Sequence, residues 1–508
     1  MLTALCLSSA AADTSSILKI QELIQAGDFV SANAALFSAL KSDPLNGGLY
    51  NLRGILNVQS GHPDKAESDF AQAIELDPKL LSAYLNLGRL YQSKIDSDPS
   101  LLRKAIAVYE RAVRIHPQSN EAHIQLGTLL EWSGSFAASL HHLAALPGSE
   151  QQRAQALALR CADLSALGRK AEAERVARQL ITAADLKNDD IRAILPLLEA
   201  KGDDQMIEVL ITGLAQRGTV SLDNQQAFAR ACERAGHLAE AKQALEQIAR
   251  EGAGEVKPLL DLARVAYKQK DREGSLGYLA HARDLQPQNA VVHFVFGVIA
   301  LELRLPLGAQ DSVNKALALD GNNPDYNYAM GIVKLHVHDT LEAVPYFEKF
   351  LAVNRDSARG HYGLGIAYYF AGNYEKARPE MELAAKSGET APGAHYFLGK
   401  IAKASGDDSI AASEFRTAIA QDSKNVEAHA ELASLLTRSQ YFNEAKNELF
   451  RALVIDGDNI TANANLLALY QKTKDARSSE QRDKLQRLEQ KRDELQDLLY
   501  RRIEVRPY

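Results

Sequence analysis

The sequence predicts an all-α solenoid of about thirteen stacked helix hairpins, with capping helices at its C-terminal end. Three observations predict this fold: small residues recur every 34 residues, strong helix formers dominate, and no segment alternates Val, Ile and Thr as a β-strand does. At 508 residues the chain is too long for one compact core, which usually holds about 150 residues. A repeat array accommodates this length because each unit packs only against its neighbours.

Two series of small residues define the repeat. Alanines mark the second helix and lie 34 residues or a multiple of 34 apart, except for one 39-residue gap: Ala32, Ala66, Ala105, Ala173, Ala241, Ala309, Ala343, Ala377, Ala411 and Ala445. Glycines mark the first helix with the same spacing and the same gap: Gly54, Gly88, Gly127, Gly297, Gly331, Gly365 and Gly399. Because small residues let paired helices approach closely, each repeat is predicted to be an antiparallel hairpin.

A third series of glycines lies between the two helices of many repeats, where the hairpin must turn. Its members are Gly27, Gly61, Gly134, Gly168, Gly202, Gly236, Gly372 and Gly406. A backbone with positive φ often ends a helix, and glycine adopts it without steric cost. We therefore expect positive φ at these positions.

Two segments resemble the signature of the tetratricopeptide repeat family. They are the run from Ala83 to Tyr91, followed by Ala105, Tyr109, Ala112 and Pro117, and the run from His361 to Tyr368, followed by Gly372 and Ala377. The resemblance covers residues 13–457 as thirteen repeats. It implies a right-handed superhelix whose concave face is lined by the first helix of each pair. It does not identify a partner, because one fold serves many functions.

The repeat pattern divides the chain into five segments. These are residues 1–12 before the first repeat, 13–146 with N-terminal repeats, 147–255 with diverged repeats, 256–459 with C-terminal repeats, and 460–508 with a capping helix and a charged C-terminal helix. In the diverged segment the small first-helix position becomes Cys161, Leu195 and Ala229, while the 34-residue period persists. We interpret this as altered curvature or looser packing within one array.

The first twelve residues have the character of a secretory signal remnant. They carry no charge and end in three alanines, Ala10 to Ala12, which fit a cleavage site. We expect the mature protein to begin near Asp13 and to be exported, to the periplasm or outside the cell, in preference to a cytoplasmic location. Since the basic segment of a signal peptide is missing, a frayed Ala-rich terminus is the alternative.

The charged segment 478–502 presents a narrow apolar seam of Leu485, Leu488, Leu495 and Leu499. One interpretation is a helix that caps the last repeat. The alternative is a coiled-coil helix that joins two copies of the chain as a homodimer, because leucines at heptad-like spacing form such seams.

Composition and motifs argue against several classes of function. The net charge of -7 disfavours nucleic-acid binding, which needs a basic surface, and no apolar run is long enough to span a membrane. Cys161 and Cys232 lie two repeats apart, too far for a disulfide, and are expected in the core. The recurring His293, His361 and His395, with His429, lie on successive first helices and cannot share a metal ion.

The sequence contains no phosphate-binding loop or zinc-ligand motif, and the repeats leave no room for a catalytic domain. We therefore expect no enzymatic activity, no cofactor and no metal. The predicted function is a scaffold that binds a protein or peptide in the concave groove. The alternative is a structural role, in which the chain self-assembles through the C-terminal helix or an apolar groove.

The most apolar stretch of the predicted groove lies on four successive first helices. In the family, the fifth, ninth and twelfth residues of each first helix face the concave side, a spacing that forms one helical stripe. The expected partner-binding residues are Phe294, Val298, Leu301, Tyr328, Ile332, Leu335, Tyr362, Ile366, Tyr369 and Tyr396. If exposed, they form a contiguous apolar patch of the kind that marks an interaction site. The alternative is that tight curvature or the chain's own terminal helix buries the stripe.

Overall fold

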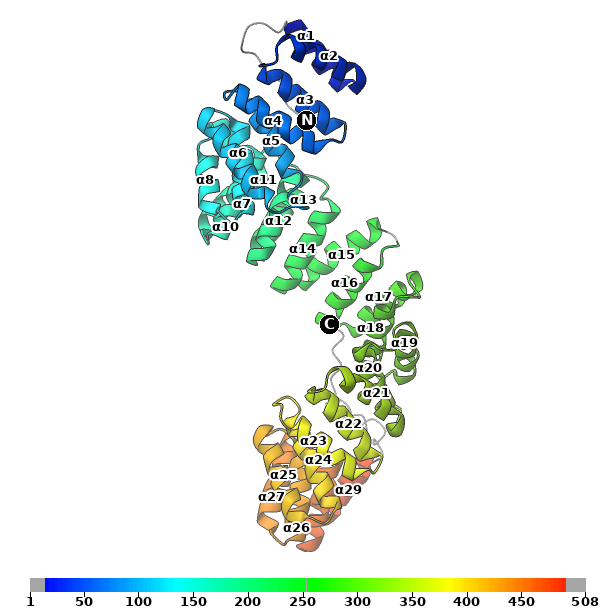
Figure 1. The fold of residues 1–508 in the computed structure, drawn as a ribbon. Coiled ribbons are helices and arrows are strands. Elements are labelled where there is room, and N and C mark those ends of the chain that lie inside the picture. Colours follow the sequence, from blue (N-terminus) through cyan, green and yellow to red (C-terminus); the bar gives the residue numbers. More distant parts are fainter. Residues whose placement is uncertain (1–13, 253, 490–508) are drawn as a thin grey trace. The chain divides into compact units, whose positions relative to one another are not determined.

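The structure, a computed structural model, describes residues 14–252 and 254–489, which form 29 α-helices and no β-strand (Figure 1). The all-α solenoid predicted from the sequence is confirmed. Residues 1–12, the expected signal remnant, lie outside the described residues.

The chain divides into two compact units, Met1–Ile248 and Ala249–Tyr508, and helix α15 (Leu238–Glu251) crosses the division. The first unit holds α1 (Thr14–Gln25), α2 (Phe29–Ser42), α3 (Gly47–Gln59), α4 (Pro63–Leu76), α5 (Leu81–Gln92), α6 (Leu101–Ile115), α7 (Asn120–Trp132), α8 (Phe136–Ala144), α9 (Gly148–Gln151), α10 (Ala154–Ala166), α11 (Lys170–Thr182), α12 (Asn188–Lys201), α13 (Asp204–Ala215) and α14 (Leu222–Ala235).

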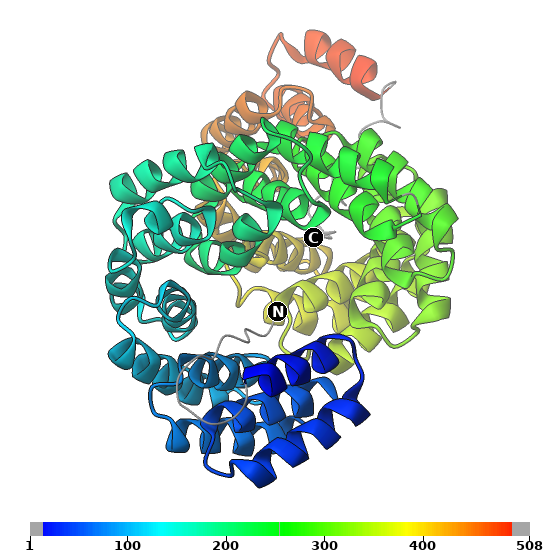
Figure 2. The same ribbon diagram turned by 90° about the horizontal axis from the view of Figure 1, so that it is seen from above.

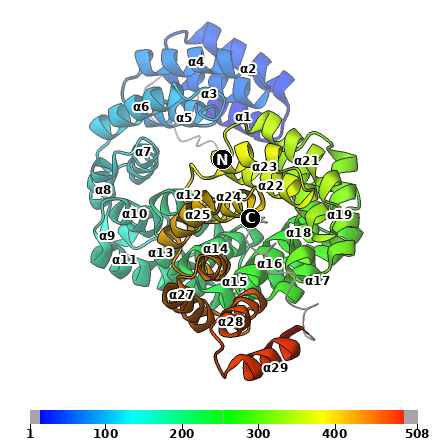
Figure 3. The same ribbon diagram turned by 90° about the horizontal axis from the view of Figure 1, so that it is seen from below.

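The second unit holds α16 (Val256–Lys268), α17 (Arg272–Leu285), α18 (Ala290–Glu302), α19 (Pro306–Leu319), α20 (Pro324–His336), α21 (Thr340–Val353), α22 (Ala358–Phe370), α23 (Tyr374–Ala384), α24 (Ala391–Ala404), α25 (Asp408–Gln421), α26 (Val426–Arg438), α27 (Phe442–Ile455), α28 (Ile460–Lys472) and α29 (Ser478–Glu489). Figures 2 and 3 show the hairpins of each unit following one another in chain order.

The helices pair as the 34-residue period predicts. Helices α1 to α8 make four hairpins and α10 to α27 make nine, which gives thirteen, with the short α9 inserted before the fifth. In the regular repeats the second helix of one hairpin packs on the first helix of the next. In the diverged segment α10 packs directly on α12, and α11 on α13. Packing between successive hairpins therefore changes in this segment, although the hairpins continue.

In several regular hairpins a first-helix glycine receives an aromatic ring from the second helix. A Cβ placed on Gly54 would lie 2.5 Å from the Phe70 ring, and one on Gly88 would lie 2.5 Å from the Tyr109 ring. Gly399 is similarly covered by Phe415. Phe70, Tyr109 and Phe415 are fully buried. In these hairpins the glycine marks where an aromatic ring needs the space of a missing side chain.

The turn glycines adopt the backbone conformation predicted from the sequence. All eight have positive φ, between 66° and 86°. The same position in five other repeats carries a residue with a Cβ that is also held at positive φ: Lys270, Arg304, His338, Gln440 and Lys474. The turn geometry is therefore imposed by the hairpin, even where the residue type disfavours it.

Helix α29 caps the last repeat. It packs on α28, and Gln481 Nε2 donates to the Asn463 carbonyl and side-chain oxygens at 3.1 and 2.8 Å. Lys484 Nζ donates to the Gly457 carbonyl at 2.8 Å. Leu488 is buried within the chain and Leu485 is half-buried. Leu495 and Leu499 lie outside the described residues, so the proposed homodimer seam is seen only in part.

The two cysteines lie in the core as predicted, and three of the recurring histidines join paired helices. Cys161 and Cys232 are buried and free. Nδ1 of His361, His395 and His429 contacts a glutamate of the paired helix at 2.6, 2.6 and 2.5 Å respectively. These contacts join the two helices of three successive hairpins, a role that the sequence analysis did not assign to the histidines.

Replacing Gly54 with Ala is expected to destabilise the first unit by about 1–3 kcal/mol, because Phe70 must move to admit the new Cβ. Gly127→Ala is the matched control: its Cβ would meet Leu143 and Ser139 at 3.4 Å, an ordinary contact distance. There the better helix propensity of Ala offsets the crowding, and the change stays below about 1 kcal/mol. Urea unfolding followed by circular dichroism measures both variants. Equal losses in the two would contradict this account of the hairpin contact.

Gln440→Gly is expected to stabilise the second unit by about 0.5–1 kcal/mol, because glycine adopts the observed φ of 65° without steric cost. Gly406→Ala, at the same point of the preceding repeat with φ 86°, is expected to have the opposite effect. The midpoints of urea unfolding measure the change in stability of both variants. A loss of stability in Gln440→Gly would show that the Gln440 side chain contributes more than its backbone strain removes.

Candidate functional site

The residues predicted to line an apolar groove lie on α18, α20, α22 and α24, but most of them are in the core. At most 7% of the surface is exposed for seven of the ten: Val298, Tyr328, Ile332, Leu335, Tyr362, Ile366 and Tyr396. Phe294, Leu301 and Tyr369 are half-buried. Most of the stripe is therefore buried, and partner binding by these residues stays a prediction.

The size of these side chains explains their burial. The Tyr328 ring packs against Phe347 and Phe350, with centroids 5.7 and 4.9 Å apart. The Tyr362 and Tyr369 rings pack against Phe397 of the next first helix, at 6.2 and 5.0 Å. Aromatic rings at these separations attract one another and exclude water. The stripe therefore joins successive repeats and leaves little apolar surface for a partner.

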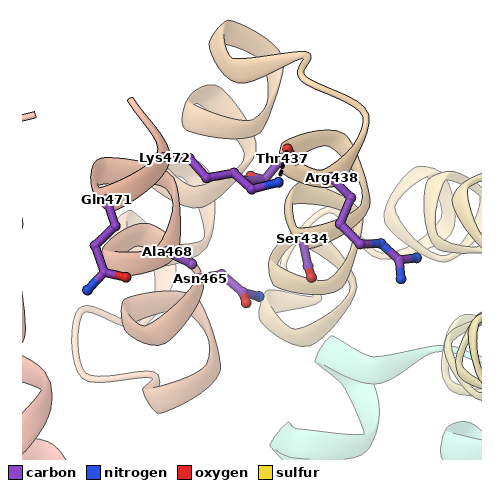
Figure 4. Close-up of a pocket in the computed structure, with 7 residues that line it drawn as sticks. All are labelled: Ser434, Thr437, Arg438, Asn465, Ala468, Gln471 and Lys472. Atoms are coloured by element: carbon purple, nitrogen blue, oxygen red, sulfur yellow. Dashed lines mark hydrogen bonds between the residues drawn. The ribbon is translucent and has the colours of Figure 1, made fainter. Parts of the chain in front are cut away.

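The first-helix surface opens where the same repeat positions carry small residues. Ala430 and Ser434 of α26 occupy the places that Tyr362 and Ile366 hold in α22, and Ala464 and Ala468 follow in α28. A pocket of about 460 Å³ lies between these two helices (Figure 4), and we call it the α26–α28 pocket. Its lining consists of Ser434, Thr437, Arg438, Asn465, Ala468, Gln471 and Lys472.

The polar groups of this pocket are only partly used within the chain. Asn465 Nδ2 donates to the Ala430 carbonyl at 2.8 Å, and Lys472 Nζ donates to the Thr437 carbonyl at 3.4 Å, shown dashed in Figure 4. The Thr437 hydroxyl is buried and has no hydrogen-bond partner. A buried hydroxyl without a partner costs free energy, so a ligand that reaches it gains an interaction that the free protein lacks.

The pocket is electropositive. Arg438 and Lys472 belong to its lining, and no Asp or Glu does. Arg438 makes an ion pair with Asp408 of α25. The Arg438 charge is thus compensated, whereas no acidic residue of the lining compensates the charge of Lys472. The pocket therefore favours an anionic group or a carbonyl oxygen.

A buried ionic network borders the pocket. Lys400 and Lys403 of α24 both contact Glu431 of α26, at 2.7 and 2.6 Å, and Lys403 Nζ also lies 3.4 Å from Ser434 Oγ. Burial acts to raise the pKa of Glu431, but the two lysines outweigh it and hold the pKa below its usual value. Two ammonium groups on one carboxylate leave one positive charge, which extends the electropositive surface toward α24.

The lining suits binding better than catalysis. It contains no His, Cys, Asp or Glu, the residues that serve most often as nucleophile or general base. Among the described residues, no group of three or more His, Cys, Asp or Glu side chains could hold a metal ion. Within the same ranges no helix has the length and apolar character needed to cross a membrane.

Two further hollows involve the second helices. One is lined by Ile419, Ser423, His429, Asn447, Phe450, Arg451, Val454 and Ile455, and the other by Arg283, Asp284, Pro287, Gln288, His293, Lys315, Ala318 and Leu319. The α26–α28 pocket differs because its lining comes entirely from first helices, which the family resemblance places on the concave face. Small residues at successive first-helix positions are the sequence signal that could have located it.

Comparison with known proteins agrees with the repeat pattern. Residues 17–80 and 328–395 match the family described as "Tetratricopeptide repeat". No curated protein matches the chain by sequence.

Solved structures with a similar fold include the "APC/C hetero-tetramer Cut9-Hcn1", with a TM-score of 0.41 and 13% identity over 90% of this chain and 96% of that chain. Yeast Tom70 matches with a TM-score of 0.37 and 17% identity over 90% of this chain and 98% of that chain. A tetratricopeptide repeat protein from Parabacteroides merdae matches with a TM-score of 0.42, 14% identity, 49% of this chain and 98% of that chain.

The family match falls on hairpins of both units: 17–80 lies within the first, and 328–395 within the second. The intervening hairpins keep the same period and the same turn geometry. Both units of the chain therefore carry tetratricopeptide repeats.

Proposed function

We propose that this protein is a non-catalytic scaffold that binds a polypeptide segment in the α26–α28 pocket, on the concave face of its second unit. The observation that carries the proposal is the pocket itself: a floor of small residues and a rim of hydrogen-bond donors, made only from first helices. Repeat arrays of this kind present extended surfaces for protein partners. The repeats that precede the pocket fill the same space with aromatic and branched side chains.

The chemistry of the pocket favours an acidic segment. Lys472 and Asn465 can donate hydrogen bonds to backbone carbonyls or to side-chain carboxylates. Charge-assisted bonds to carboxylates are roughly twice as strong as neutral ones, so acidic side chains gain most here. Since the whole chain carries a net charge of -7, this local positive surface also directs such a segment to one place.

The ionic network beside the pocket keeps the binding surface in shape. Because Glu431 is held by both Lys400 and Lys403, it ties α24 to α26 and fixes the spacing between these first helices. A surface that is already ordered loses less conformational entropy when a ligand binds. The network therefore supports binding without itself entering the pocket.

Self-assembly, the alternative function, has less support. The apolar stripe on α18 to α24 is core, and Leu488 of α29 is buried within its own chain. A homodimer would thus need a surface other than the apolar groove. We therefore keep polypeptide binding as the proposed function.

The test uses fluorescein-labelled twelve-residue peptides that are acidic, neutral or basic, with binding measured by fluorescence anisotropy on the full chain. Acidic peptides are expected to bind best, and their affinity to fall as salt rises. Lys472→Gln should weaken acidic-peptide binding by about five- to tenfold, the loss of one charge-assisted hydrogen bond. Ala468→Leu should weaken binding of all peptides by filling the pocket, because Ala468 is exposed within it.

Two control variants place the same changes outside the pocket. Lys446→Gln removes a lysine of α27 that lies over the Phe450 ring, and Ala420→Leu enlarges an exposed alanine of α25. Both should bind acidic peptides like the unchanged protein. If the pocket variants also bind normally while remaining folded, the binding surface lies elsewhere.

A further inference from the structure

Two carboxyl groups are buried together inside the first unit, where α7 and α8 pack against α10. Asp163 of α10 is fully buried, and Glu131 at the end of α7 is 6% exposed. Ser139 of α8 is fully buried beside them. Carboxyl groups are almost never buried to this extent without a partner, so the cluster calls for a physical explanation.

The repeat pattern shows that an aspartate is out of place at Asp163. The equivalent residue is apolar in every later repeat and in three of the four earlier ones, the first hairpin being the exception. These apolar residues are Leu56, Leu90, Leu129, Leu197, Ala231, Val265, Ile299, Val333, Ala367, Ile401, Leu435 and Leu469. These residues contribute to the contact between neighbouring helices. An aspartate here replaces packing with an ionisable group at the joint between the fourth and fifth hairpins.

Neither carboxyl group has a cationic partner that would stabilise its charge. Both carboxyl oxygens of Asp163, Glu131 Oε2 and Ser139 Oγ lack hydrogen bonds of normal geometry. Arg160 lies one helical turn before Asp163 on α10, yet the described part of the chain contains no ion pair between them.

Charged groups on the surrounding helices are engaged elsewhere. His142 of α8 contacts His123 of α7 at 3.3 Å between the Nδ1 atoms, and burial followed by its histidine neighbours lowers the pKa of His142 to about 4. It is therefore neutral near pH 7 and supplies no positive charge. His141 stacks on His142 with ring centroids 5.5 Å apart.

Many charged side chains on the helices around α7 and α10 contact other residues. Around α9, α11 and α12 the ion pairs are Glu150 with Arg153, Glu172 with Arg169, Arg192 with Asp189 and Glu199 with Arg230. Lys201 lies over the Phe136 ring, and Asp203 accepts a hydrogen bond from Ser165. On the α6 side, Lys104 pairs with Glu67 and Arg111 lies over the Tyr84 ring. None of these contacts includes Glu131 or Asp163.

Burial without compensation favours the neutral form of both groups. Burial raises the pKa of Glu131 to about 8, and the charge of Asp163 adds a smaller effect in the same direction. Burial also raises the pKa of Asp163 to about 7, against a smaller opposing effect of Ser139. The charge of Asp163 disfavours ionisation of Glu131, because two like charges in one buried contact repel each other.

We propose that Glu131 and Asp163 form a proton-operated joint between the fourth and fifth hairpins, closed when both carboxyls hold protons and opened when they lose them. In the closed state α7 and α10 pack around neutral groups. Ionisation puts two like charges into the same contact, and the two helices must separate or admit water to hydrate them. The joint lies next to α9, the short helix inserted between the fourth and fifth hairpins.

The direction of the pH dependence follows from proton binding. Both carboxyls keep protons in the folded state over a pH range in which the unfolded chain, with carboxyl pKa values of about 4, has lost them. Their contribution to stability is thus full below about pH 4 and is lost as pH rises through the raised folded values. In the closed-to-open equilibrium, each released proton shifts the balance toward opening by up to about tenfold per pH unit.

Hydrogen exchange on the full chain tests this joint. Amide protection in α7 and α10, corrected for the intrinsic effect of pH on exchange, is expected to fall by at least tenfold between about pH 6 and pH 9. Protection in α3 and α4, which lie outside the joint, is expected to stay constant. The variant that carries Glu131→Gln and Asp163→Asn mimics the protonated groups and should keep its α10 protection over the whole range.

Two further variants keep the test decisive. Glu131→Gln alone leaves one ionisable group and should roughly halve the slope of the logarithm of α10 protection against pH. Asp163→Leu restores the residue type of the neighbouring repeats and should remove this slope. Circular dichroism at about pH 6, where both carboxyls of the unchanged protein hold protons, verifies that each variant is folded. A pH-independent α10 in the unchanged protein, or an equal fall in the Asp163→Leu variant, would overturn the proposal.

Discussion

The contact on which the rest of the solenoid depends is the one between a first-helix glycine and the large side chain that covers it. At Gly54, Gly88 and Gly399 a ring from the second helix occupies the volume that a Cβ would need. Each ring is fully buried, so this contact sets the distance between the two helices of the hairpin. Because every later hairpin stacks on the one before it, that distance is repeated along the array.

Side-chain size at equivalent positions then decides whether the first helices form core or open surface. Tyr362 and Ile366 reach neighbouring helices and close the space between them, whereas Ala430 and Ser434 at the same repeat positions do not. The chain thus needs no special loop to make a pocket. A change from large to small residues within the same geometry is sufficient, and it places the donors Asn465 and Lys472 on the rim.

Much of the fold could be predicted from the sequence, but less of the site. The period, the number of hairpins and the positive φ at the turn glycines follow from local residue types, which act within one hairpin. The burial of Ile332 and Ile366 does not follow from local residue types. It depends on side chains of neighbouring repeats, which the period alone does not place. The glutamate partners of the histidines are also non-local, since each lies on the other helix of the hairpin.

Two buried glutamates, Glu131 and Glu431, behave in opposite ways, and the difference has one cause. Glu431 is as buried as Glu131, yet the pKa of Glu431 is lowered whereas that of Glu131 is raised. Two lysines reach Glu431, and only another carboxyl group acts on Glu131. Burial amplifies whichever interaction is present, because the low dielectric strengthens attraction and repulsion alike. A repeat array can therefore obtain a rigid ionic tie or a proton-sensitive joint from the same residue type, according to whether a cation is supplied by the next helix.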